Sequence, residues 1–392
     1  MCADVTKTEV ATPPTRAFTS HEPAEPSREK TLRVCYFGAY DREYVRNVVL
    51  INGLRRNGVE VVECHDAHAV KPWRLPRLVA KYARLARHVD AIVVGACGHA
   101  YVPLARLLAS VTGKPLIFDS FLSQYDTAIE DRRTASPRSL HARYYRGLDR
   151  VAVACSDVVL LDTPQYIDYF SEHYRAPRSK YRALPIGADD ENFYPSPLPQ
   201  GENFRVLFVG TFIPLHGLEY VLQAAALLKD HRDIEFTIVG AGQTFPEMRR
   251  LADDLQLQNT HFVGEQAPAR CAQSVRESDV CLGIFGRGEK TARVIPCKVY
   301  EALSSARPVV TGDTPAAREL LVDGESAMLC PVGDAAALAK AVLSLKSDVA
   351  LRQRIAQNGS RVFLQKATPA VLGLQLKAII SAAVASRRHG KA

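Results

Sequence analysis

The chain has 392 residues, enough for two domains of ordinary size, and its content of 47% hydrophobic and 23% charged residues is that of a soluble globular protein. The formal net charge of +8 is concentrated, because residues 71–150 hold 14 Lys and Arg against 6 Asp and Glu. The nine cysteines are scattered without a Cys-x-x-Cys pair or zinc-like spacing. This distribution argues against a disulfide framework and a structural metal, and it favours a reducing, cytoplasmic location.

The first 30 residues are predicted to form a disordered tail. They contain four prolines and alternating charges, and they lack the apolar core of a signal peptide. No run of 18 apolar residues is apparent elsewhere, so we expect no membrane-spanning segment.

Short apolar runs alternate with helix-like stretches over residues 31–185. The expected strands are 32–38, 59–64, 90–96, 114–120, 156–163 and 180–185, and helices are expected at 43–58 and 100–113. Continuous apolar strands between helices are typical of a parallel sheet that is covered on both faces. Residues 186–203 are rich in Pro, Gly, Asn and acids, and we interpret them as a linker.

The same alternation restarts at residue 204. Strands are expected at 204–210, 234–242, 260–264, 278–285, 307–313 and 326–332, and helices at 217–229, 334–345, 348–359 and 368–385. The fold class is therefore α/β, with two doubly wound, Rossmann-like domains at 31–185 and 204–367 and a last helix that is a candidate to cross back to the first domain. Ligands bind beyond the carboxyl ends of such strands, so the cleft between the domains is the expected site.

Several nucleotide-binding signatures are absent from the sequence. "GAG" at 240–242 lacks the third glycine of a dinucleotide fingerprint, and "GRGEKT" at 286–291 is no phosphate loop. No Asp-x-Asp pair is present to chelate a diphosphate through a metal. A diphosphate would have to be held by cations and helix N-termini, and no metal or other cofactor is expected.

A cluster of cations precedes a helix in "EKTARVIPCKVYEALSSARPVV" (289–310). Lys290, Arg293 and Lys298 lead into the helix, and Glu301 lies one turn into it. Cations beside a helix N-terminus favour an anion, and a carboxylate beyond them can accept hydrogen bonds from hydroxyls. A phosphate next to a sugar fits both parts; the alternative is an ordinary solvated loop.

Ordered landmarks in both halves resemble the retaining GT-B glycosyltransferases of family 4 (group 1). In the second half these are "RVLFVGTFIPLHGLEYVLQAAALL", "IVGAG", "HFVGEQ" and "KVYEALSSARPVV…ELLVDGESAML"; in the first they are "CSDVVLLDT", "YFSEHY" and "LPIGADDENFYP". The resemblance covers roughly residues 31–385. It implies a GT-B fold, a nucleotide-sugar donor bound by the C-terminal half, an acceptor bound by the N-terminal half, and transfer with retention.

The resemblance assigns donor-binding roles, and three positions depart from the family pattern. Glu301 matches the acid that grips the ribose hydroxyls, and Gly38 matches the glycine of the first strand's loop. Arg293 replaces the first acid of the family's E-x7-E pair, and Thr211 and His216 replace its usual Arg and Lys. We therefore expect Lys290, Arg293 and Lys298 to bind the diphosphate instead. The donor-binding candidates are Gly38, Thr211, His216, Gly264, Lys290, Arg293, Lys298 and Glu301.

The acceptor side is expected in the polar segment 116–136. Asp119 occupies the place where the family commonly has a His near the reacting sugar, with Ser120 and Tyr125 nearby, and His99 follows another strand. Asp119 and Glu301 are the catalytic candidates. The alternatives are that Asp119 caps the next segment and that His99 is structural.

The segment 71–88 carries six Lys and Arg at spacings of three or four among apolar and aromatic residues. This pattern suits a helix on an anionic membrane surface, which would fit a lipid-linked or oligosaccharide acceptor and a peripheral location on the inner face of the membrane. The alternative is an ordinary layer helix with a solvated basic side. Nucleic acid is not an expected partner, since no base-stacking motif accompanies the charge.

Two further functions stay open. A non-catalytic GT-B scaffold or partner subunit is favoured by the three departures at Thr211, His216 and Arg293. A sugar-nucleotide epimerase of similar two-domain shape would bind the same donor but need no acceptor groove.

Overall fold

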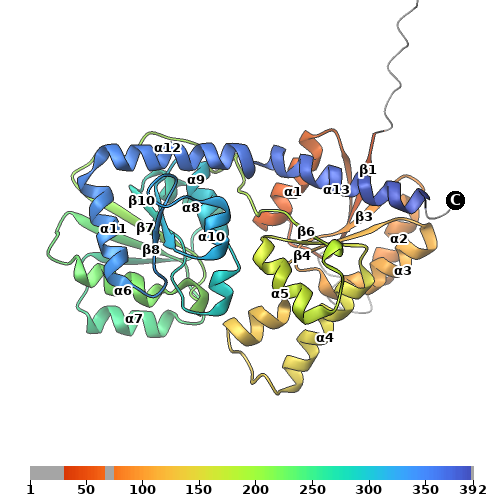
Figure 1. The fold of residues 1–392 in the computed structure, drawn as a ribbon, viewed down its shortest axis with the longest axis horizontal. Helices are drawn as coiled ribbons and strands as arrows, with labels where there is room; N and C mark the ends of the chain where they lie inside the picture. Colours follow the sequence, from red (N-terminus) through yellow and green to blue (C-terminus); the bar gives the residue numbers. More distant parts are fainter. Residues whose placement is uncertain (1–30, 67–74, 390–392) are drawn as a thin grey trace, which may run out of the picture. The chain divides into compact units, whose positions relative to one another are not determined.

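Two six-stranded parallel sheets form the framework of the chain (Figure 1). The computed structural model describes residues 31–66 and 75–389, and residues 32–392 group into one compact unit. The prediction of an α/β protein with two doubly wound domains is confirmed.

The first sheet has the strand order β2-β1-β3-β4-β5-β6. Its strands are β1 (Arg33–Gly38), β2 (Glu60–His65), β3 (Ala91–Val94), β4 (Leu116–Phe121), β5 (Val158–Leu161) and β6 (Tyr181–Ala183). Its helices are α1 (Val45–Arg56), α2 (Leu75–Leu85), α3 (Val102–Thr112), α4 (Leu140–Cys155) and α5 (Pro164–Tyr174), and a π-helical turn, η3, spans Asp126–Asp131.

The second sheet has the order β12-β11-β10-β7-β8-β9, the arrangement of a dinucleotide-binding fold. Its strands are β7 (Phe204–Val209), β8 (Ile234–Val239), β9 (Thr260–Gly264), β10 (Val280–Leu282), β11 (Val309–Gly312) and β12 (Met328–Cys330). Its helices are α6 (Leu218–Leu227), α7 (Phe245–Asp254), α8 (Pro268–Arg276), α9 (Cys297–Ser304), α10 (Pro315–Leu320), α11 (Ala335–Ser347) and α12 (Val349–Lys366). The strand order reverses between β7 and β10, so the carboxyl ends of these strands are where a ligand is expected.

Alternation of side chains separates the first sheet's two cores. Cys35, Phe37 and Phe118 face α2, α3, α4 and α5, whereas Val34 and Tyr36 face α1 and the last helix, α13 (Pro369–His389). The helix at the C-terminus thus packs on the N-terminal sheet. At the crossing of α1 and α13, a Cβ atom on Gly373 would lie 2.0 Å from the backbone of Gly53, so the close approach requires glycine.

One helical stretch, Val349–His389, is long and apolar enough to cross a membrane by length and composition, although the sequence analysis found no such segment. It consists of α12 and α13, and 39% of its most apolar 18-residue window is buried. The buried Phe363, Leu372, Leu376 and Ile380 belong to the protein's hydrophobic cores. Length and composition alone do not distinguish a core helix from a spanning one.

The helix expected within 71–88 is α2, and it packs as a layer helix. Leu78 and Tyr82 are buried in the core beneath it, whereas Arg77, Lys81 and Arg84 are exposed. The apolar side of α2 is therefore used by the protein's own core and is not free to enter a membrane. Lys71, Trp73 and Arg74 lie outside the described residues.

Candidate functional site

A cavity of about 350 Å³, here called the central cavity, lies at the carboxyl ends of strands from both sheets. The first sheet and its loops contribute Tyr44, Phe121, Leu122, Thr127, Asp131, Arg132 and Asp162. The second contributes Gly210, Thr211, Leu215, His216, Lys290, Cys297, Lys298 and Glu301. Cations, carboxylates and apolar side chains therefore line the same cavity.

The N-terminus of α9 opens on the central cavity. Pro296, Cys297 and Lys298 line it where the helix begins, so the positive end of the helix dipole faces the enclosed space. Proline suits the start of a helix because the first backbone N–H groups have no partner within the helix. This geometry favours an anionic group, as the sequence indicated.

Lys298 is a buried cation without a partner. The residue is 9% exposed, and its Nζ has no hydrogen-bond acceptor among the described residues. The Nζ atom lies 3.7 Å from the centre of the Phe208 ring. Burial lowers the pKa of Lys298 to about 7, against the opposing attraction of Glu301. An ammonium held in this way gains most when an anion enters the cavity.

Gly210 makes room for this ammonium. A Cβ atom there would lie 2.6 Å from the Lys298 Nζ, and the residue has a φ of +155° at the end of β7. Both features favour glycine. Gly210, directly after β7, therefore leaves the space that the Lys298 side chain occupies.

Glu301 lies one turn beyond Lys298 on the same face of α9 and also lines the central cavity. Burial raises the pKa of the Glu301 carboxyl to about 7, opposed by the charge of Lys298. Residues three apart on a helix are neighbours, so the charge of each group influences the pKa of the other without an ion pair between them.

His216 and Thr211 also line the central cavity, and they contact each other. The Nδ1 of His216 lies 2.5 Å from the Thr211 carbonyl oxygen. Because a carbonyl only accepts, Nδ1 carries the hydrogen. Burial, and then the charge of Lys298, lower the pKa of His216 well below its usual value. The neutral ring therefore presents Nε2 as an acceptor, which suits a hydroxyl and not a phosphate oxygen.

Lys290 reaches the cavity, but Arg293 does not. The Lys290 Nζ donates to Thr127 Oγ1 at 2.6 Å and lies 3.8 Å from Asp126 Oδ2. The Arg293 guanidinium bonds Asp126 Oδ1 at 2.8 Å and lies 4.3 Å from the Tyr169 ring centre. Lys290 and Lys298 thus line the cavity, whereas Arg293 joins η3 and α5 to its own loop; binding of a diphosphate by these cations stays a prediction.

The two glycines among the donor-binding candidates lie outside the lining of the central cavity. Gly38 ends β1, where an added Cβ atom would be 3.6 Å from the ring of Tyr101. The next residue, Ala39, lines a second pocket, which is described below. Gly264 ends β9 with a φ of +70° and accepts a backbone hydrogen bond from Gly240.

Asp119 is fully buried and paired with Arg46. The Nε and Nη2 of Arg46 each donate to one carboxylate oxygen at 2.9 Å, and Nη1 donates to the carbonyl oxygens of Leu184 and Pro185. Asp119 does not line the central cavity. Its bidentate ion pair with Arg46 joins β4 to α1. The sequence analysis had expected Asp119 to be a catalytic group in the cavity.

The other acceptor-side candidates form a buried network around Asp149. The His99 Nε2 lies 3.3 Å from both Ser120 Oγ and Asp149 Oδ1, and the backbone N–H of Tyr125 donates to Asp149 Oδ2 at 3.0 Å. Burial lowers the pKa of His99. Neither the central cavity nor the adjoining pocket is lined by His99, Ser120 or Tyr125.

The adjoining pocket, of about 400 Å³, opens beyond β1 and β3. It shares Tyr44, Leu122, Thr127 and Arg132 with the central cavity, so the two spaces are continuous in their lining. Its remaining side includes Tyr40, Asp41, Asn47, Cys97, Tyr101 and Gln124. Aromatic rings beside hydroxyl-binding groups can hold a polyol or sugar ring.

With this geometry established, comparison with known proteins gives a match for the second half of the chain. Residues 203–348 match the family model described as "Glycosyl transferases group 1", and this segment contains β7, α9, Lys298 and Glu301. This half of the chain is similar to the group 1 glycosyl transferases. The predicted resemblance to that group is confirmed there; assignment to family 4 and retention stay predictions.

The curated relatives match mainly over part of their length. A phosphatidyl-myo-inositol mannosyltransferase of Mycolicibacterium smegmatis is 33% identical over 174 residues, which cover 43% of this chain and 44% of that protein. An α-D-kanosaminyltransferase of Streptomyces kanamyceticus is 26% identical over 76% of this chain and 78% of that protein. The chain thus spans less than half the length of the first curated relative in its match.

Solved structures confirm the GT-B fold over nearly the whole chain. HepE of Anabaena, in a complex with UDP, aligns with a TM-score of 0.66 at 18% identity and covers 90% of this chain and all of that one. Sucrose-phosphate synthase of Thermosynechococcus elongatus aligns with a TM-score of 0.68 at 17% identity over 91% of this chain and all of that one. At these identities the likeness shows the fold alone.

Two residues that line the central cavity were missed by sequence reasoning. Asp162 follows β5 in the quoted "CSDVVLLDT"; its Oδ1 has no hydrogen-bond partner among the described residues, and burial raises its pKa to about 7. Arg132 follows η3 and lines both spaces. The sequence features that could have indicated them are, for Asp162, a carboxylate directly after a buried strand and, for Arg132, a cation within the polar segment 116–136.

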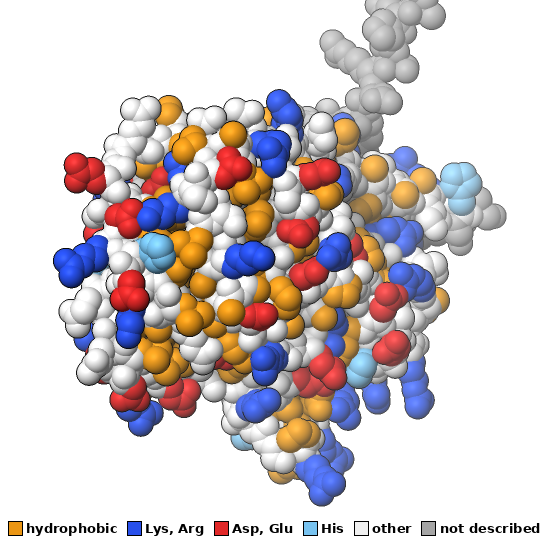
Figure 2. Space-filling view, turned by 60° about the vertical axis from the view of Figure 1, so that its left-hand side comes forward, with side chains coloured by type: hydrophobic (Ala, Val, Ile, Leu, Met, Phe, Trp, Pro, Cys, Tyr) orange, Lys and Arg blue, Asp and Glu red, His pale blue; other side chains and the backbone are white. Residues whose placement is uncertain are grey.

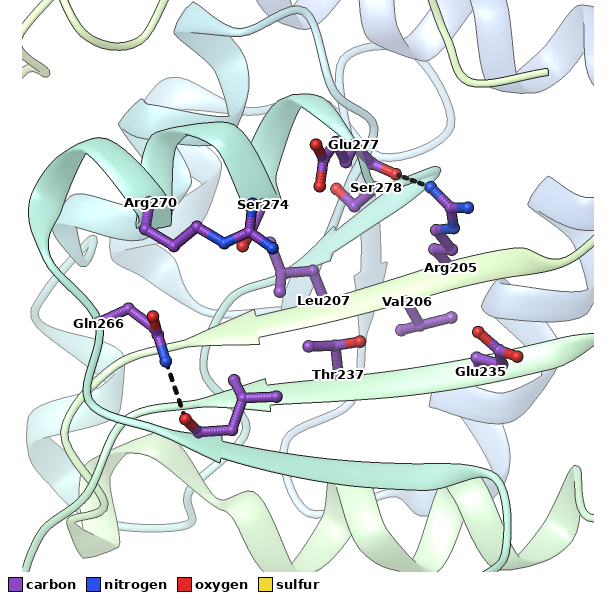
Figure 3. Close-up of a pocket in the computed structure, with 11 residues that line it drawn as sticks. Arg205, Val206, Leu207, Glu235, Thr237, Gln266, Arg270, Ser274, Glu277 and Ser278 are labelled. Atoms are coloured by element: carbon purple, nitrogen blue, oxygen red, sulfur yellow. Dashed lines mark hydrogen bonds between the residues drawn. The ribbon is translucent and has the colours of Figure 1, made fainter. Parts of the chain in front are cut away.

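A second hollow, of about 500 Å³, lies between α8 and the strands β7 and β8 of the second sheet (Figure 3). Arg205 and Glu235 stand near the amino ends of β7 and β8, and Gln266 donates to the Val263 carbonyl oxygen. Ligands of doubly wound sheets bind at the opposite ends of the strands, so this hollow does not compete with the central cavity as the site. Across the described residues, no group of three or more His, Cys, Asp or Glu could hold a metal ion.

Proposed function

We propose that the protein transfers a glycosyl group from a nucleoside diphosphate sugar to an acceptor hydroxyl, with retention and without a metal ion. The observation that carries this proposal is the unpartnered, buried ammonium of Lys298 beside Glu301 at the start of α9, inside a cavity lined by both domains. The match of residues 203–348 to the group 1 glycosyl transferases and the names of the mannosyl- and kanosaminyltransferase relatives support it.

In this proposal the donor lies along α9. Its diphosphate accepts hydrogen bonds from Lys298 and Lys290 and faces the N-terminus of the helix, while Glu301 accepts hydrogen bonds from the ribose hydroxyls. The neutral His216 accepts a hydrogen bond from a hydroxyl of the sugar. A neighbouring fold crystallised with UDP is consistent with a nucleoside diphosphate in this position.

The acceptor, a lipid-linked or oligosaccharide alcohol, would occupy the adjoining pocket. Its reacting hydroxyl then attacks the anomeric carbon on the same face from which the diphosphate oxygen departs, so the configuration at that carbon is retained. The nucleoside diphosphate leaves with the bonding electrons, and the hydroxyl proton passes to an acceptor group. Asp162 has a free carboxylate oxygen at the cavity and can take this proton or stabilise positive charge on the sugar.

The location proposed is the cytoplasm. Of the cysteines in the described residues, each of the eight is free, which suits the reducing compartment where nucleotide sugars serve as donors.

One assay separates the three candidate functions. Release of nucleoside diphosphate from a panel of nucleotide sugars is measured with and without acceptors, including a lipid extract and free glycans. A transferase releases the diphosphate faster when its acceptor is present; an epimerase converts the donor sugar without an acceptor; a non-catalytic scaffold does neither.

Metal independence is tested in the same assay. Turnover is expected to be unchanged in EDTA, because Lys290, Lys298 and the α9 N-terminus neutralise the diphosphate. Loss of turnover in EDTA that Mg²⁺ restores would overturn this part of the proposal.

A further inference from the structure

The C-terminal domain supplies little fixed positive charge for a departing diphosphate. Each phosphate of a nucleoside diphosphate sugar is negatively charged, and the phosphate that loses the sugar gains further charge as the bond breaks. Thr211 and His216 stand where the family resemblance expects Arg and Lys, and the His216 ring is neutral. Lys290 and Lys298 remain, and burial lowers the pKa of both ammonium groups. Among the described residues that line the central cavity, one further cation is present, Arg132.

Arg132 reaches the central cavity from the N-terminal domain. It directly follows the π-helical turn η3, and its backbone N–H donates to the Thr127 carbonyl oxygen at 3.1 Å. The carbonyl oxygen of Arg132 accepts a hydrogen bond from the Gln243 side-chain amide at 2.8 Å. Gln243 belongs to the loop between β8 and α7 of the C-terminal domain. Hydrogen bonds from both domains therefore fix the backbone of Arg132 beside the cavity.

The guanidinium of Arg132 has no partner of its own within the described part of the chain. No hydrogen bond, ion pair or ring contact of its side chain is formed there, whereas Arg293 is paired with Asp126. Burial is the largest cause that lowers the pKa of His216 and the pKa of Lys290, and the charge of Arg132 acts in the same direction on both. An unpaired guanidinium therefore lies near two residues of the proposed donor site.

Exposure of a cation is not by itself a functional signal in this protein. Figure 2 shows Lys and Arg side chains interspersed with Asp and Glu over the face in view, and such surface charges need no ligand. Arg132 is also exposed, but it lines both the central cavity and the adjoining pocket. The next residue, Arg133, is exposed and lines neither space. The two neighbouring arginines therefore differ in their access to the site.

We propose that Arg132 is a further diphosphate-binding cation, which the N-terminal domain supplies in place of the Arg and Lys that are absent after β7. Its guanidinium donates hydrogen bonds to the phosphate that leaves the sugar, so the attraction grows as negative charge develops there. Arginine suits this position because it stays charged under conditions in which a buried lysine loses its proton. The inference rests on the proposed function, since it adds a residue to the same donor site.

Calorimetric titration of the full chain with UDP, GDP, the corresponding nucleosides and inorganic pyrophosphate tests the assignment. Arg132→Gln should weaken binding of the preferred nucleoside diphosphate and of pyrophosphate about ten-fold, while nucleoside binding stays unchanged. In turnover with the donor sugar, the same change should lower kcat more than it raises the KM for the donor, because the leaving phosphate gains charge in the transition state. Arg132→Lys should recover part of the loss, since it keeps the charge without the planar guanidinium.

Arg133→Gln is the matched control, because it removes an exposed cation from the same loop and should leave diphosphate affinity and turnover as they are in the unchanged chain. Thermal melting of each variant checks that the fold is intact. Equal losses in Arg132→Gln and Arg133→Gln would overturn the inference in favour of general charge attraction. A loss in Arg132→Gln that appears only in acceptor-dependent turnover, with diphosphate affinity unchanged, would also overturn it and would place Arg132 on the acceptor.

Lys298→Met distinguishes failure of this inference from failure of the proposed function. Loss of diphosphate affinity in Lys298→Met but not in Arg132→Gln would overturn the role of Arg132 and leave the proposed donor site standing. If the unchanged chain binds neither diphosphate, or if both variants bind as it does, the proposed donor site fails and the role of Arg132 fails with it.

Discussion

The two domains contribute walls of different composition to the central cavity. The C-terminal wall presents Lys290, Lys298 at the start of α9, and Glu301, whereas the N-terminal wall presents Asp131, Arg132, Asp162 and the ring of Tyr44. Both walls lie at the carboxyl ends of parallel sheets. In the proposed function the two lysines and the α9 N-terminus orient a donor with its diphosphate toward the C-terminal domain and its sugar toward the other.

The comparison extends to two carboxylates at the ends of adjacent strands. Asp119 in β4 has both oxygens bonded to Arg46, whereas Asp162 after β5 keeps one oxygen without a partner among the described residues. Both are buried, yet only Asp162 lines the cavity. A carboxylate whose hydrogen bonds are all made within the protein stabilises the fold. A carboxylate oxygen without a hydrogen-bond partner is available to bind a ligand or a proton.

The largest expected effect separates these two aspartates. Asp119→Ala leaves the buried Arg46 guanidinium without its carboxylate, and it should lower the free energy of unfolding by about 3–5 kcal/mol. Asp162→Asn removes a carboxylate that has an incomplete set of partners, so it should leave stability nearly unchanged while lowering kcat. Urea denaturation and turnover measurements on both variants check the contrast. Equal stability of the two variants would contradict the assignment of Asp119 as the structural member.

The next effect tests the cationic wall. Lys298→Met should weaken nucleoside diphosphate binding by about 1.5–3 kcal/mol, the usual contribution of a charged hydrogen bond, while leaving nucleoside binding nearly unchanged. Calorimetric titration with both ligands measures the difference. Arg293→Met is the matched comparison, because its charge is used by Asp126 outside the cavity. Arg293→Met should lower the melting temperature and leave diphosphate affinity nearly unchanged. A loss of diphosphate affinity at an unchanged melting temperature would return Arg293 to the donor site.

A smaller effect is expected at Glu301. Glu301→Gln keeps a neutral acceptor in the same place, so nucleoside binding should weaken by about 1–2 kcal/mol. Inorganic pyrophosphate, which has no ribose, should bind this variant at least as well as it binds the unchanged chain. Wild-type affinity for the nucleoside in the Gln variant, measured by calorimetry, would overturn the assignment of Glu301 to the ribose.

The sequence predicted the architecture well because strand burial leaves a continuous apolar signal. Each expected strand of the second domain has a counterpart among β7–β12, although 278–285 shortens to Val280–Leu282. Helices α4 and α5 were not predicted. The inner side of α4 carries Asp149 in place of an apolar residue, because the Asp149 carboxylate accepts hydrogen bonds in a buried network. A local pattern cannot reveal a polar residue whose partners lie on other elements.

The site was predictable where it follows one helix and not where it depends on distant pairing. Lys298 and Glu301 are fixed relative to each other by α9, so their spacing in the sequence sufficed. The charge of Asp119 is paired with Arg46, which is 73 residues away along the chain. The charge of Arg293 is paired with Asp126, which is 167 residues away. Which carboxylate is neutralised is thus a property of the tertiary structure.

The last prediction concerns protons taken up with the ligand. Burial lowers the pKa of Lys298 to about 7, so at pH 8 its ammonium is mostly deprotonated in the empty cavity. A diphosphate favours the charged form and raises this pKa, and binding at pH 8 should therefore take up close to one proton. Affinity should fall as pH rises above about 7, because protonation then costs part of the binding free energy.

Calorimetry in buffers with different ionisation enthalpies measures the uptake directly. Lys298→Arg is the matched control, because arginine stays charged at pH 8 and has no proton to gain. Uptake should disappear in this variant, and it should also diminish at pH 6, where Lys298 is already charged. Proton release at pH 8, or uptake that persists in the Arg variant, would show that another group responds to the ligand and would remove Lys298 from the diphosphate site.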